Sequence, residues 1–307
     1  MRGELPATVR VVEVGPRDGL QNEARIWPTA DKVELIRRLV DSGLREIEAT
    51  AFVHPKVIPP MADADAVSAA LPRLPGVIYS ALVPNTRGYA RALAAGIDEM
   101  IVFMSVSESH SRSNINKTVA EALAACAEVV QACKADGKPV RAYLSTIYGC
   151  PYEGDIAPAR VVALTQSLLD LGVSRVSLGD TTGVATPGQV RDVLGRLLDR
   201  VAPQQLGLHF HDTRGMAIAN ILVGLEMGLS IVESAIGGMG GCPYAPGASG
   251  NVATEEVIHL LHGLGVGTGV DLDRLLGVGL WIESVTGQSL SSKLLHAEAS
   301  RLLSLVT

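Results

Sequence analysis

The stretch LGLHFHD, at residues 206–212, combines the alternation of a buried β-strand with two histidines on the same side. Successive side chains of a strand point to opposite faces, so Leu208 and Phe210 are expected on one face. His209 and His211 then share the other face, with backbones about 6 to 7 Å apart. Because metal–nitrogen bonds are about 2.0 to 2.2 Å long, both imidazoles can reach one ion. The strand predicts half of a metal site; the alternative is a polar patch of the core filled by two imidazoles.

Similar short apolar stretches alternate with helix-period segments along the chain, as expected of repeated β-α units around a parallel sheet. Eight such units without a break in composition predict a closed (β/α)8 barrel, the TIM barrel of the α/β class. Thr186-Pro187 predicts a helix start, with a hydroxyl cap followed by proline at the first helical position. The predicted strands cover residues 9–14, 46–50, 78–83, 100–106, 140–146, 175–178, 207–211 and 231–235, and the clearest helices cover 30–42, 118–136, 158–171 and 188–201.

The segment after the eighth unit differs from the rest of the chain. Residues from about 270 to 307 contain no ninth strand and are expected to form two or three amphipathic helices, one of them over 291–305. We therefore expect one catalytic barrel domain, residues 1–307, in which residues 270–307 form a helical C-terminal extension.

Composition limits the kinds of partner. The 307 residues carry a net charge of -6 with no basic run, which argues against nucleic acid and favours a small metabolite. No stretch approaches about 18 uninterrupted apolar residues, and the start lacks the apolar segment of a secretory signal, so no membrane span is expected and a cytoplasmic location is. The cysteines show no C-x-x-C spacing and are expected to be free thiols: Cys126, Cys133, Cys150 and Cys242.

Charged residues lie directly after the first predicted strand and within the second. The active sites of barrel enzymes are found at the carboxyl ends of the strands. Arg17 and Asp18 lie in a bend made by a proline and two glycines. Asp18 offers an oxygen ligand and Arg17 could stabilise oxyanion charge, although a solvated ion pair is the alternative. Glu48 alternates into the barrel interior, where an unpaired carboxylate is costly. Arg17 is its nearest candidate partner, unless Glu48 is a rim residue in water.

A glycine-rich segment, GGMGGCPYAPGASGN at residues 237–251, follows the eighth strand. Glycine permits backbone conformations and close contacts that other residues forbid, so the segment is expected to be a mobile or closely approached loop. It matches neither phosphate-binding pattern, G-x-x-x-x-G-K-[ST] or G-x-G-x-x-G. Asn251 could offer a carbonyl oxygen to a metal. Cys242 could transfer a proton as the loop closes, or simply fill space in a turn.

Three runs resemble the hydroxymethylglutaryl-CoA lyase family: VGPRDGLQNE at 14–23, HFHDTRGMAIAN at 209–220 and GGMGGCPYAPGASGNVATE at 237–255. The similarity extends from about residue 9 to residue 290. It implies a (β/α)8 barrel that holds Mg2+ or Mn2+, with Asp18, His209, His211 and Asn251 as ligands. It further implies that Arg17 stabilises charge, that Glu48 supports Arg17 and that Cys242 is a mobile proton donor or acceptor. Catalytic roles for Asp18 and His209, and substrate contacts from Arg17 and Gln21, are implied as well.

The activity implied by the resemblance is retro-Claisen cleavage of 3-hydroxy-3-methylglutaryl-CoA, or a close 3-hydroxyacyl-CoA, to acetyl-CoA and a keto acid, acetoacetate for the family's usual substrate. A cytoplasmic homodimer, acting in leucine degradation and ketone body metabolism on an acyl-CoA, is implied with it. The alternatives are a Claisen-type condensing synthase of the same superfamily, or a barrel that binds acyl-CoA or metal without turnover. Four residues depart from the family pattern and are expected to line or stiffen the acyl pocket, which leaves a longer or differently branched substrate open: Ala51, His54, His110 and Pro246.

Overall fold

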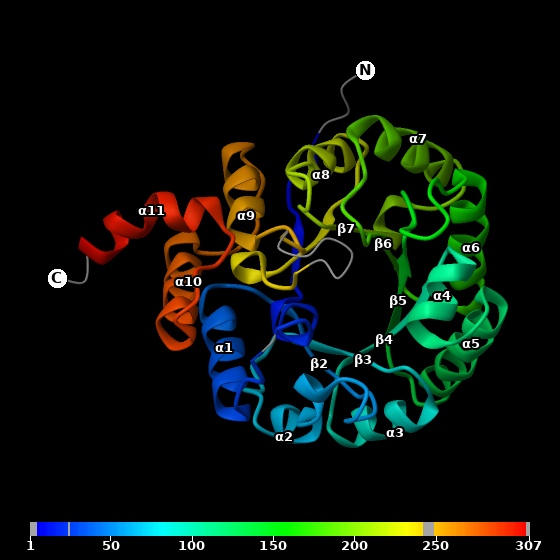
Figure 1. The fold of residues 1–307 in the computed structure, drawn as a ribbon, viewed down its shortest axis with the longest axis horizontal. Helices are drawn as coiled ribbons and strands as arrows, with labels where there is room; N and C mark the ends of the chain where they lie inside the picture. Colours follow the sequence, from blue (N-terminus) through cyan, green and yellow to red (C-terminus); the bar gives the residue numbers. More distant parts are fainter. Residues whose placement is uncertain (1–4, 24, 242–248, 305–307) are drawn as a thin grey trace.

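Eight parallel strands close into a barrel in chain order, and β8 pairs with β1 to complete the ring (Figure 1). The architecture is that of a computed structural model, which describes residues 5–23, 25–241 and 249–304. All eight predicted strands are present, which confirms the TIM barrel. The sixth runs two residues further than predicted and ends at Asp180. The strands are β1 (Arg10–Glu13), β2 (Glu46–Ala51), β3 (Ile78–Leu82), β4 (Glu99–Ser105), β5 (Val140–Ser145), β6 (Val176–Asp180), β7 (Leu206–Phe210) and β8 (Ile231–Ser234).

Helices cover the outside of the barrel, and their ends follow the expected capping rules. At the start of α7, Thr186 Oγ1 accepts a hydrogen bond from the Gln189 amide, and Gln189 Oε1 accepts one from the Thr186 amide. This reciprocal cap, with Pro187 directly after it, explains why the helix begins there. The helices of the ring are α1 (Thr29–Asp41), α2 (Ala64–Ala69), α3 (Thr86–Ala94), α4 (Glu108–Ile115), α5 (Val119–Ala135), α6 (Pro158–Leu171), α7 (Pro187–Leu198), α8 (Ala217–Glu226) and α9 (Thr254–Gly263).

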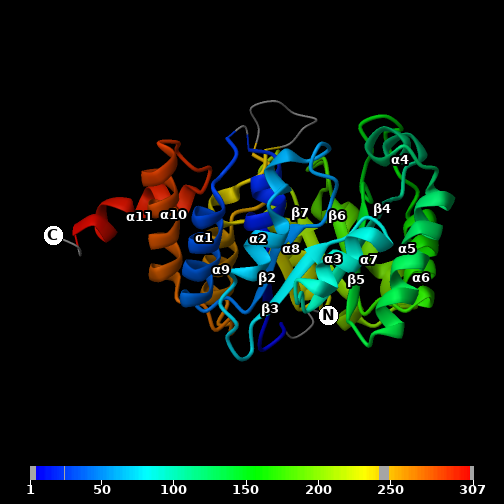
Figure 2. The same ribbon diagram turned by 90° about the horizontal axis from the view of Figure 1, so that it is seen from below.

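Two helices follow the ring, α10 (Leu272–Thr286) and α11 (Lys293–Ser304), in agreement with the predicted C-terminal helices. They lie outside the ring, where α10 contacts α1 and both α10 and α11 contact α9 (Figures 1 and 2). The last helix begins two residues later than predicted because Ser292 Oγ accepts a hydrogen bond from the Leu295 amide and so caps it. In the part of the chain that the structure describes, no helix is long and apolar enough to cross a membrane.

The apolar core and the barrel interior have different chemistry. Buried aliphatic side chains of the strands and surrounding helices form one extensive core cluster, to which Leu35 of α1 and Val130 of α5 belong. Inside the barrel, charged side chains from several strands form ion pairs instead. Arg141 of β5 is fully buried among three glutamates, namely Glu48, Glu99 and Glu233. The interior therefore holds charges at fixed positions directly beneath the carboxyl ends of the strands.

The described residues also form four short helical turns: η1 (Gly15–Gly19), η2 (Pro59–Met61), η3 (Pro203–Gln205) and η4 (Ile236–Gly238). The first and last of these follow β1 and β8, which are neighbours in the barrel. Glu13 joins them, since its Oε1 accepts hydrogen bonds from the amides of Gly15 and Ile236, both at 2.8 Å. A side chain at Gly15 would place its Cβ only 2.6 Å from that oxygen, so the turn requires glycine.

Candidate active site

The turn η1 positions Arg17 and Asp18 at the carboxyl end of β1. The carbonyl of Val14 accepts hydrogen bonds from the amides of Asp18 at 2.7 Å and Gly19 at 3.3 Å, which makes one π-helical turn. Such turns are rare and are frequently found at functional sites. The bend predicted after the first strand therefore takes a defined shape that directs both charged side chains to the barrel mouth.

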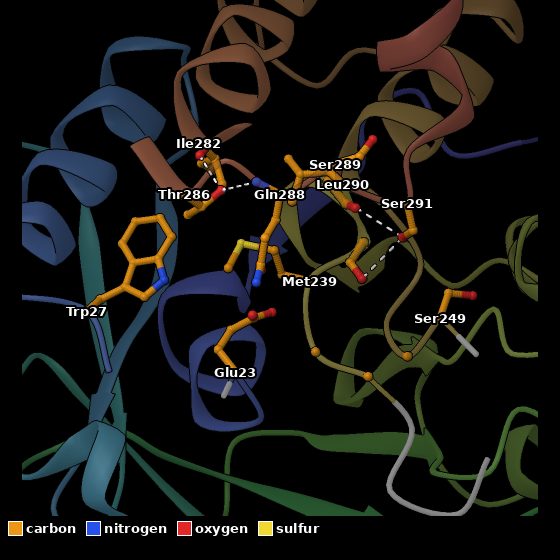
Figure 3. Close-up of a pocket in the computed structure, with 15 residues that line it drawn as sticks. Glu23, Trp27, Met239, Ser249, Ile282, Thr286, Gln288, Ser289, Leu290 and Ser291 are labelled. Carbon is orange, nitrogen blue, oxygen red and sulfur yellow. Dashed lines mark hydrogen bonds between the residues drawn. The ribbon is translucent and has the colours of Figure 1, made fainter. Parts of the chain in front are cut away.

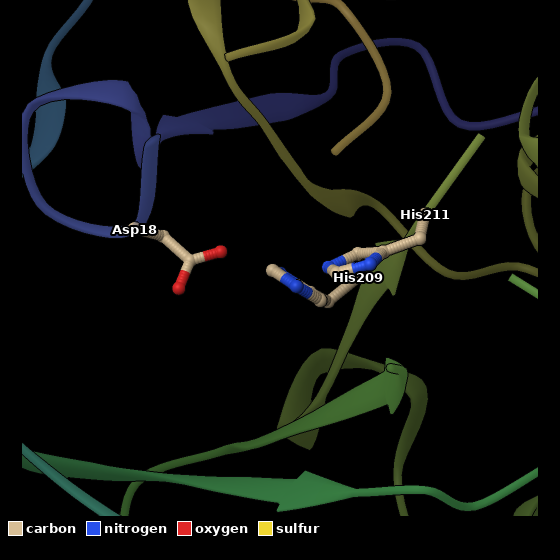
Figure 4. Close-up of side chains that lie close together, drawn as sticks. All are labelled: Asp18, His209 and His211. Atoms are coloured by element: carbon tan, nitrogen blue, oxygen red, sulfur yellow. The ribbon is translucent and has the colours of Figure 1, made fainter. Parts of the chain in front are cut away.

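Asp18, His209 and His211 converge at that mouth, as predicted for the metal site. One ligand atom from each residue lies within 4.8 Å of the other two, and the close-up shows the carboxylate facing both imidazoles (Figure 4). His209 belongs to β7 and His211 follows directly after it, so the alternation of the strand places both rings on one side. The predicted convergence of the two histidines is confirmed.

The charges of this cluster influence one another. Burial alone would raise the pKa of Asp18, but the charges of Arg17, His209 and His211 lower it below its usual value. Burial lowers the pKa of His211 to about 4, and the neighbouring His209 adds to the effect. Burial also acts to lower the pKa of His209, but its hydrogen bond to Glu233 and the charge of that carboxylate raise it. The cluster thus favours an ionised Asp18 and a neutral His211, the protonation states that a metal ion requires.

Two ring nitrogens indicate that the cluster fits a divalent cation. His211 Nδ1 is buried, and among the described residues it has no hydrogen-bond partner. A buried nitrogen without a partner costs roughly 1 to 3 kcal/mol, a penalty that a bound ion removes. His209 Nδ1 lies 3.0 Å from Glu233 Oε2, and a proton on Nδ1 leaves Nε2 free to bind an ion. One carboxylate and two imidazoles form a mixed oxygen and nitrogen donor set for a divalent metal.

Glu48 is completely buried inside the barrel and pairs with Arg17, as predicted. Glu48 Oε1 accepts a hydrogen bond from Arg17 Nε, and Arg17 Nη1 donates to Asp18 Oδ1 at 2.7 Å. Burial opposes the charged guanidinium, but Glu48 and Asp18 raise the pKa of Arg17 above its usual value. The guanidinium is thus a permanent cation, held between a buried carboxylate and a proposed metal ligand. The alternative of a rim glutamate in water is wrong.

Three predicted site residues remain: Gln21 and Asn251, which the structure describes, and Cys242, which it does not. Gln21 is half-buried and lines the main cavity. Asn251 lies beside Asp18, but its amide nitrogen, not its carbonyl oxygen, faces the carboxylate, donating to Asp18 Oδ2 at 2.9 Å and to the Met239 carbonyl at 3.2 Å. A ligand role for Asn251 stays a prediction. Cys242 lies outside the described residues, and the described cysteines are free, as predicted: Cys126, Cys133 and Cys150.

Two described glycines of the glycine-rich segment, Gly240 and Gly250, approach each other at the barrel mouth. A Cβ on Gly250 would lie 1.4 Å from the carbonyl oxygen of Gly240, so the backbones of these two glycines are in direct contact. His211 and Asn251 form an isolated antiparallel bridge beside this contact. The base of the segment is therefore fixed next to the proposed metal ligands.

A cavity of about 840 Å³ opens above the cluster. Its volume is within the range of sites for small molecules, about 300 to 1,000 Å³. Arg17, Asp18, His209 and His211 line it, and the lining continues to residues of α4 and α5. Of the four residues that depart from the family pattern, His54 and His110 line this cavity, Ala51 is buried in β2, and Pro246 lies outside the described residues.

Comparison with known proteins agrees with this geometry. A family model described as HMGL-like matches residues 8–282. The chain belongs to the HMGL-like family. It is 51% identical over 289 residues to the mitochondrial hydroxymethylglutaryl-CoA lyase of Arabidopsis thaliana, an alignment that covers 94% of this chain but only 62% of that relative. It is 48% identical over 288 residues to a hydroxymethylglutaryl-CoA lyase of Bacillus subtilis, which covers 94% of this chain and 96% of the relative. A crystal structure of a Bacillus subtilis HMG-CoA lyase superposes with a TM-score of 0.94 at 48% identity, covering 95% and 98% of the two chains.

Three residues of this HMGL-like barrel contact Glu48 or His209 but were not predicted from the sequence: Arg141, Tyr143 and Glu233. Tyr143 donates a hydrogen bond to Glu48 Oε2 at 2.7 Å, and its ring packs edge-on against His209. A signal for Arg141 and Tyr143 was available, since both interrupt the apolar strand at alternate positions and so share its inner face. Glu233 gave the same signal in the short apolar strand β8.

A second cavity, of about 320 Å³, lies between described residues of the glycine-rich segment and α10 with the residues that follow it (Figure 3). Trp27, Met239, Ile282 and Leu290 contribute to its walls. Ser291 Oγ and its amide donate hydrogen bonds to the Gly237 carbonyl, so the connection between α10 and α11 holds the start of the segment from behind. None of the proposed metal ligands lines this cavity, which separates it from the chemistry.

Proposed function

We propose that the chain is a divalent-metal-dependent carbon–carbon lyase that cleaves 3-hydroxy-3-methylglutaryl-CoA, or a close 3-hydroxyacyl-CoA, to acetyl-CoA and a keto acid, which for the first substrate is acetoacetate. The observation that carries the proposal is the cluster of Asp18, His209 and His211 beside the buried Arg17–Glu48 pair. Hydroxymethylglutaryl-CoA lyases that are 46 to 51% identical to this chain support it.

Asp18, His209, His211 and Asn251 are proposed to hold Mg2+ or Mn2+. When bound, such a cation polarises and orients substrate oxygens. The lowered pKa of Asp18 keeps its carboxylate ionised, which suits a metal ligand better than a strong base. Asp18 is nevertheless proposed to take the proton of the C3 hydroxyl.

Arg17 is proposed to stabilise the enolate of acetyl-CoA as the C2–C3 bond breaks. Its guanidinium is permanently charged, nearly buried and fixed by Glu48, and a preorganised cation of this kind lowers the barrier without reorganisation at the moment of reaction. Gln21 and Arg17 are proposed to contact the substrate from the cavity wall. Cys242 of the glycine-rich segment is proposed to transfer a proton to or from the substrate.

The physiological setting is also a proposal. Acetyl-CoA and acetoacetate as products would suit leucine degradation and ketone body metabolism. A cytoplasmic location is proposed as well. Among the described residues, no helix is long and apolar enough to cross a membrane. We treat residues 1–307 as one catalytic unit, with residues 270–307 as its helical extension. A homodimer face is proposed at the exposed apolar side chains of Ile26 and of Val285 in α10, which lie close together because Arg25 donates a hydrogen bond to the Val285 carbonyl.

The test uses purified protein, stripped of metal by a chelator and reloaded with Mg2+ or Mn2+, and a panel of 3-hydroxyacyl-CoAs. Release of acetyl-CoA together with a keto acid, dependent on the added metal, is expected. Incubation of acetyl-CoA with keto acids distinguishes a condensing synthase, because condensation followed by hydrolysis would liberate free CoA. Binding of the CoA esters without any turnover would indicate a non-catalytic barrel, and either outcome would overturn the lyase.

A further inference from the structure

Glu233 of β8 lies directly behind the metal cluster. Its side chain is fully buried, and its Oε2 lies 3.0 Å from His209 Nδ1. Its other oxygen, Oε1, accepts hydrogen bonds from Arg141 Nη1 at 3.0 Å and from Ser177 Oγ. One oxygen of this carboxylate therefore faces the cluster, and the other binds two partners inside the barrel.

Arg141 connects Glu233 to the other half of the site. Its Nη2 donates to Glu48 Oε2 at 3.1 Å, and Glu48 in turn binds Arg17. The two terminal nitrogens of this guanidinium, Nη1 and Nη2, thus reach two carboxylates, one behind His209 and one behind Arg17. Glu99 contacts the same guanidinium, at 3.2 Å from Nε, but its further ion pair is with Arg175, away from the cluster.

We propose that Glu233 is a positioning residue that sets the proton and the orientation of His209, and that Arg141 fixes Glu233 for this task. The inference rests on the proposed function, since it assigns a role toward the metal of that site. A carboxylate at Nδ1 keeps the proton on that nitrogen and directs Nε2 toward the ion, and such partners of ligating histidines typically change metal affinity about 10- to 100-fold. Because Arg141 also holds Glu48, the metal ligand His209 and the cation Arg17 are held by one buried group.

Glu233→Gln is the decisive variant. The amide has a single acceptor oxygen, whereas Glu233 serves both Arg141 and His209 as an acceptor. The permanent cation takes that oxygen, so the NH2 group turns toward His209 and forces the ring proton onto Nε2, the ligand atom. Glu233→Asp keeps the charge that Arg141 requires but shortens the side chain by one methylene, so the carboxylate no longer spans both partners.

Glu99→Gln is the matched control. It removes a buried carboxylate from the same guanidinium and leaves every contact of His209 in place. The full-length chain is stripped of metal, and Mn2+ affinity is measured at pH 8 by calorimetry and by the spin resonance signal of free Mn2+. Circular dichroism and thermal melting establish that each variant is folded.

We expect Glu233→Gln to weaken Mn2+ binding about 10- to 100-fold, Glu233→Asp to weaken it by a smaller factor, and Glu99→Gln to leave it within twofold of the wild type. In the Glu233 variants, excess Mn2+ is expected to recover most of the lost kcat. Wild-type Mn2+ affinity in either folded Glu233 variant, or an equal loss in Glu99→Gln, would overturn the inference and leave the proposed lyase intact. A wild-type chain that binds no Mn2+ would instead overturn the proposed metal site itself.

Discussion

Glu48→Gln tests how far the charged interior supports both stability and catalysis. Three donors converge on Glu48: Arg17 Nε at Oε1, and Arg141 Nη2 and Tyr143 Oη at Oε2, at 3.1 and 2.7 Å. A glutamine offers one acceptor oxygen, and its NH2 group would face a donor. The substitution removes the desolvation cost of one carboxylate, but it leaves two buried arginines with one counter-charge fewer, so the net effect is destabilising.

The magnitude follows from the burial of this pair. Breaking a buried ion pair by removing one partner costs about 3 to 5 kcal/mol. At about 2 °C per kcal/mol for a chain of this size, Tm is expected to fall by about 6 to 10 °C. Arg17 loses the group that fixes it, and loss of one preorganised donor to an oxyanion typically lowers kcat about 10²- to 10³-fold.

Thermal melting and steady-state cleavage of 3-hydroxy-3-methylglutaryl-CoA at saturating Mn2+ measure both effects. Glu226→Gln is the control, because it breaks an ion pair with Arg191 at the surface, where side-chain exposures of 30% and 57% limit the effect to at most about 1 kcal/mol. A Glu48→Gln protein that melts within about 2 °C of the wild type and retains its kcat would refute the reasoning.

Two further substitutions separate the roles assigned above to Cys242 and Asp18, and a third tests Glu255, a buried carboxylate of α9. Cys242→Ser replaces the thiol with a much weaker acid and is expected to lower kcat about 10²- to 10⁴-fold, with unchanged Mn2+ affinity and Tm; a normal kcat would leave the cysteine a packing role. Asp18→Asn removes a charged ligand and is expected to lose both activity and Mn2+ affinity in calorimetric titrations, and unaltered Mn2+ binding would exclude it as a ligand. Burial raises the pKa of Glu255 from 4.5 to about 8, so the folded chain keeps a proton that the unfolded chain releases between these pH values. The free energy of unfolding is therefore expected to fall by up to about 4 kcal/mol from pH 4.5 to 8, and denaturant titrations should show a smaller fall for Glu255→Gln; equal falls would contradict this.

The alternation of apolar residues in strands and their helical period between strands predicted the barrel well, because each strand and helix is a short continuous segment with a buried face. The alternation in residues 206–212 was sufficient to place His209 and His211 on one face, and the position of Asp18 after the first strand was sufficient to bring it to them. What alternation could not predict was the partner of each buried charge. Arg141 and Glu233 are 92 residues apart, and their contact depends on the closure of the barrel.

Side-chain orientation at Asn251 was also beyond the reach of sequence. A loop amide can present either its oxygen or its nitrogen, and the choice depends on neighbours that the fold supplies. Here Asp18 and the Met239 carbonyl are both acceptors, and they attract the NH2 group. Strand ends were misjudged for a related reason: β6 extends to Asp180 because Phe210 of β7 pairs with it, a contact between segments far apart in the chain.

The contact between Gly240 and Gly250 has a consequence for protein engineering. Because the backbone of Gly240 approaches that of Gly250, a segment placed between them would start and end at nearly the same point of the barrel mouth. Doubling the length of a closed loop adds only about 0.6 kcal/mol of closure entropy. Segments of different length, taken from other members of the family, should therefore be interchangeable between Gly240 and Gly250 while the barrel and its charged interior stay as they are.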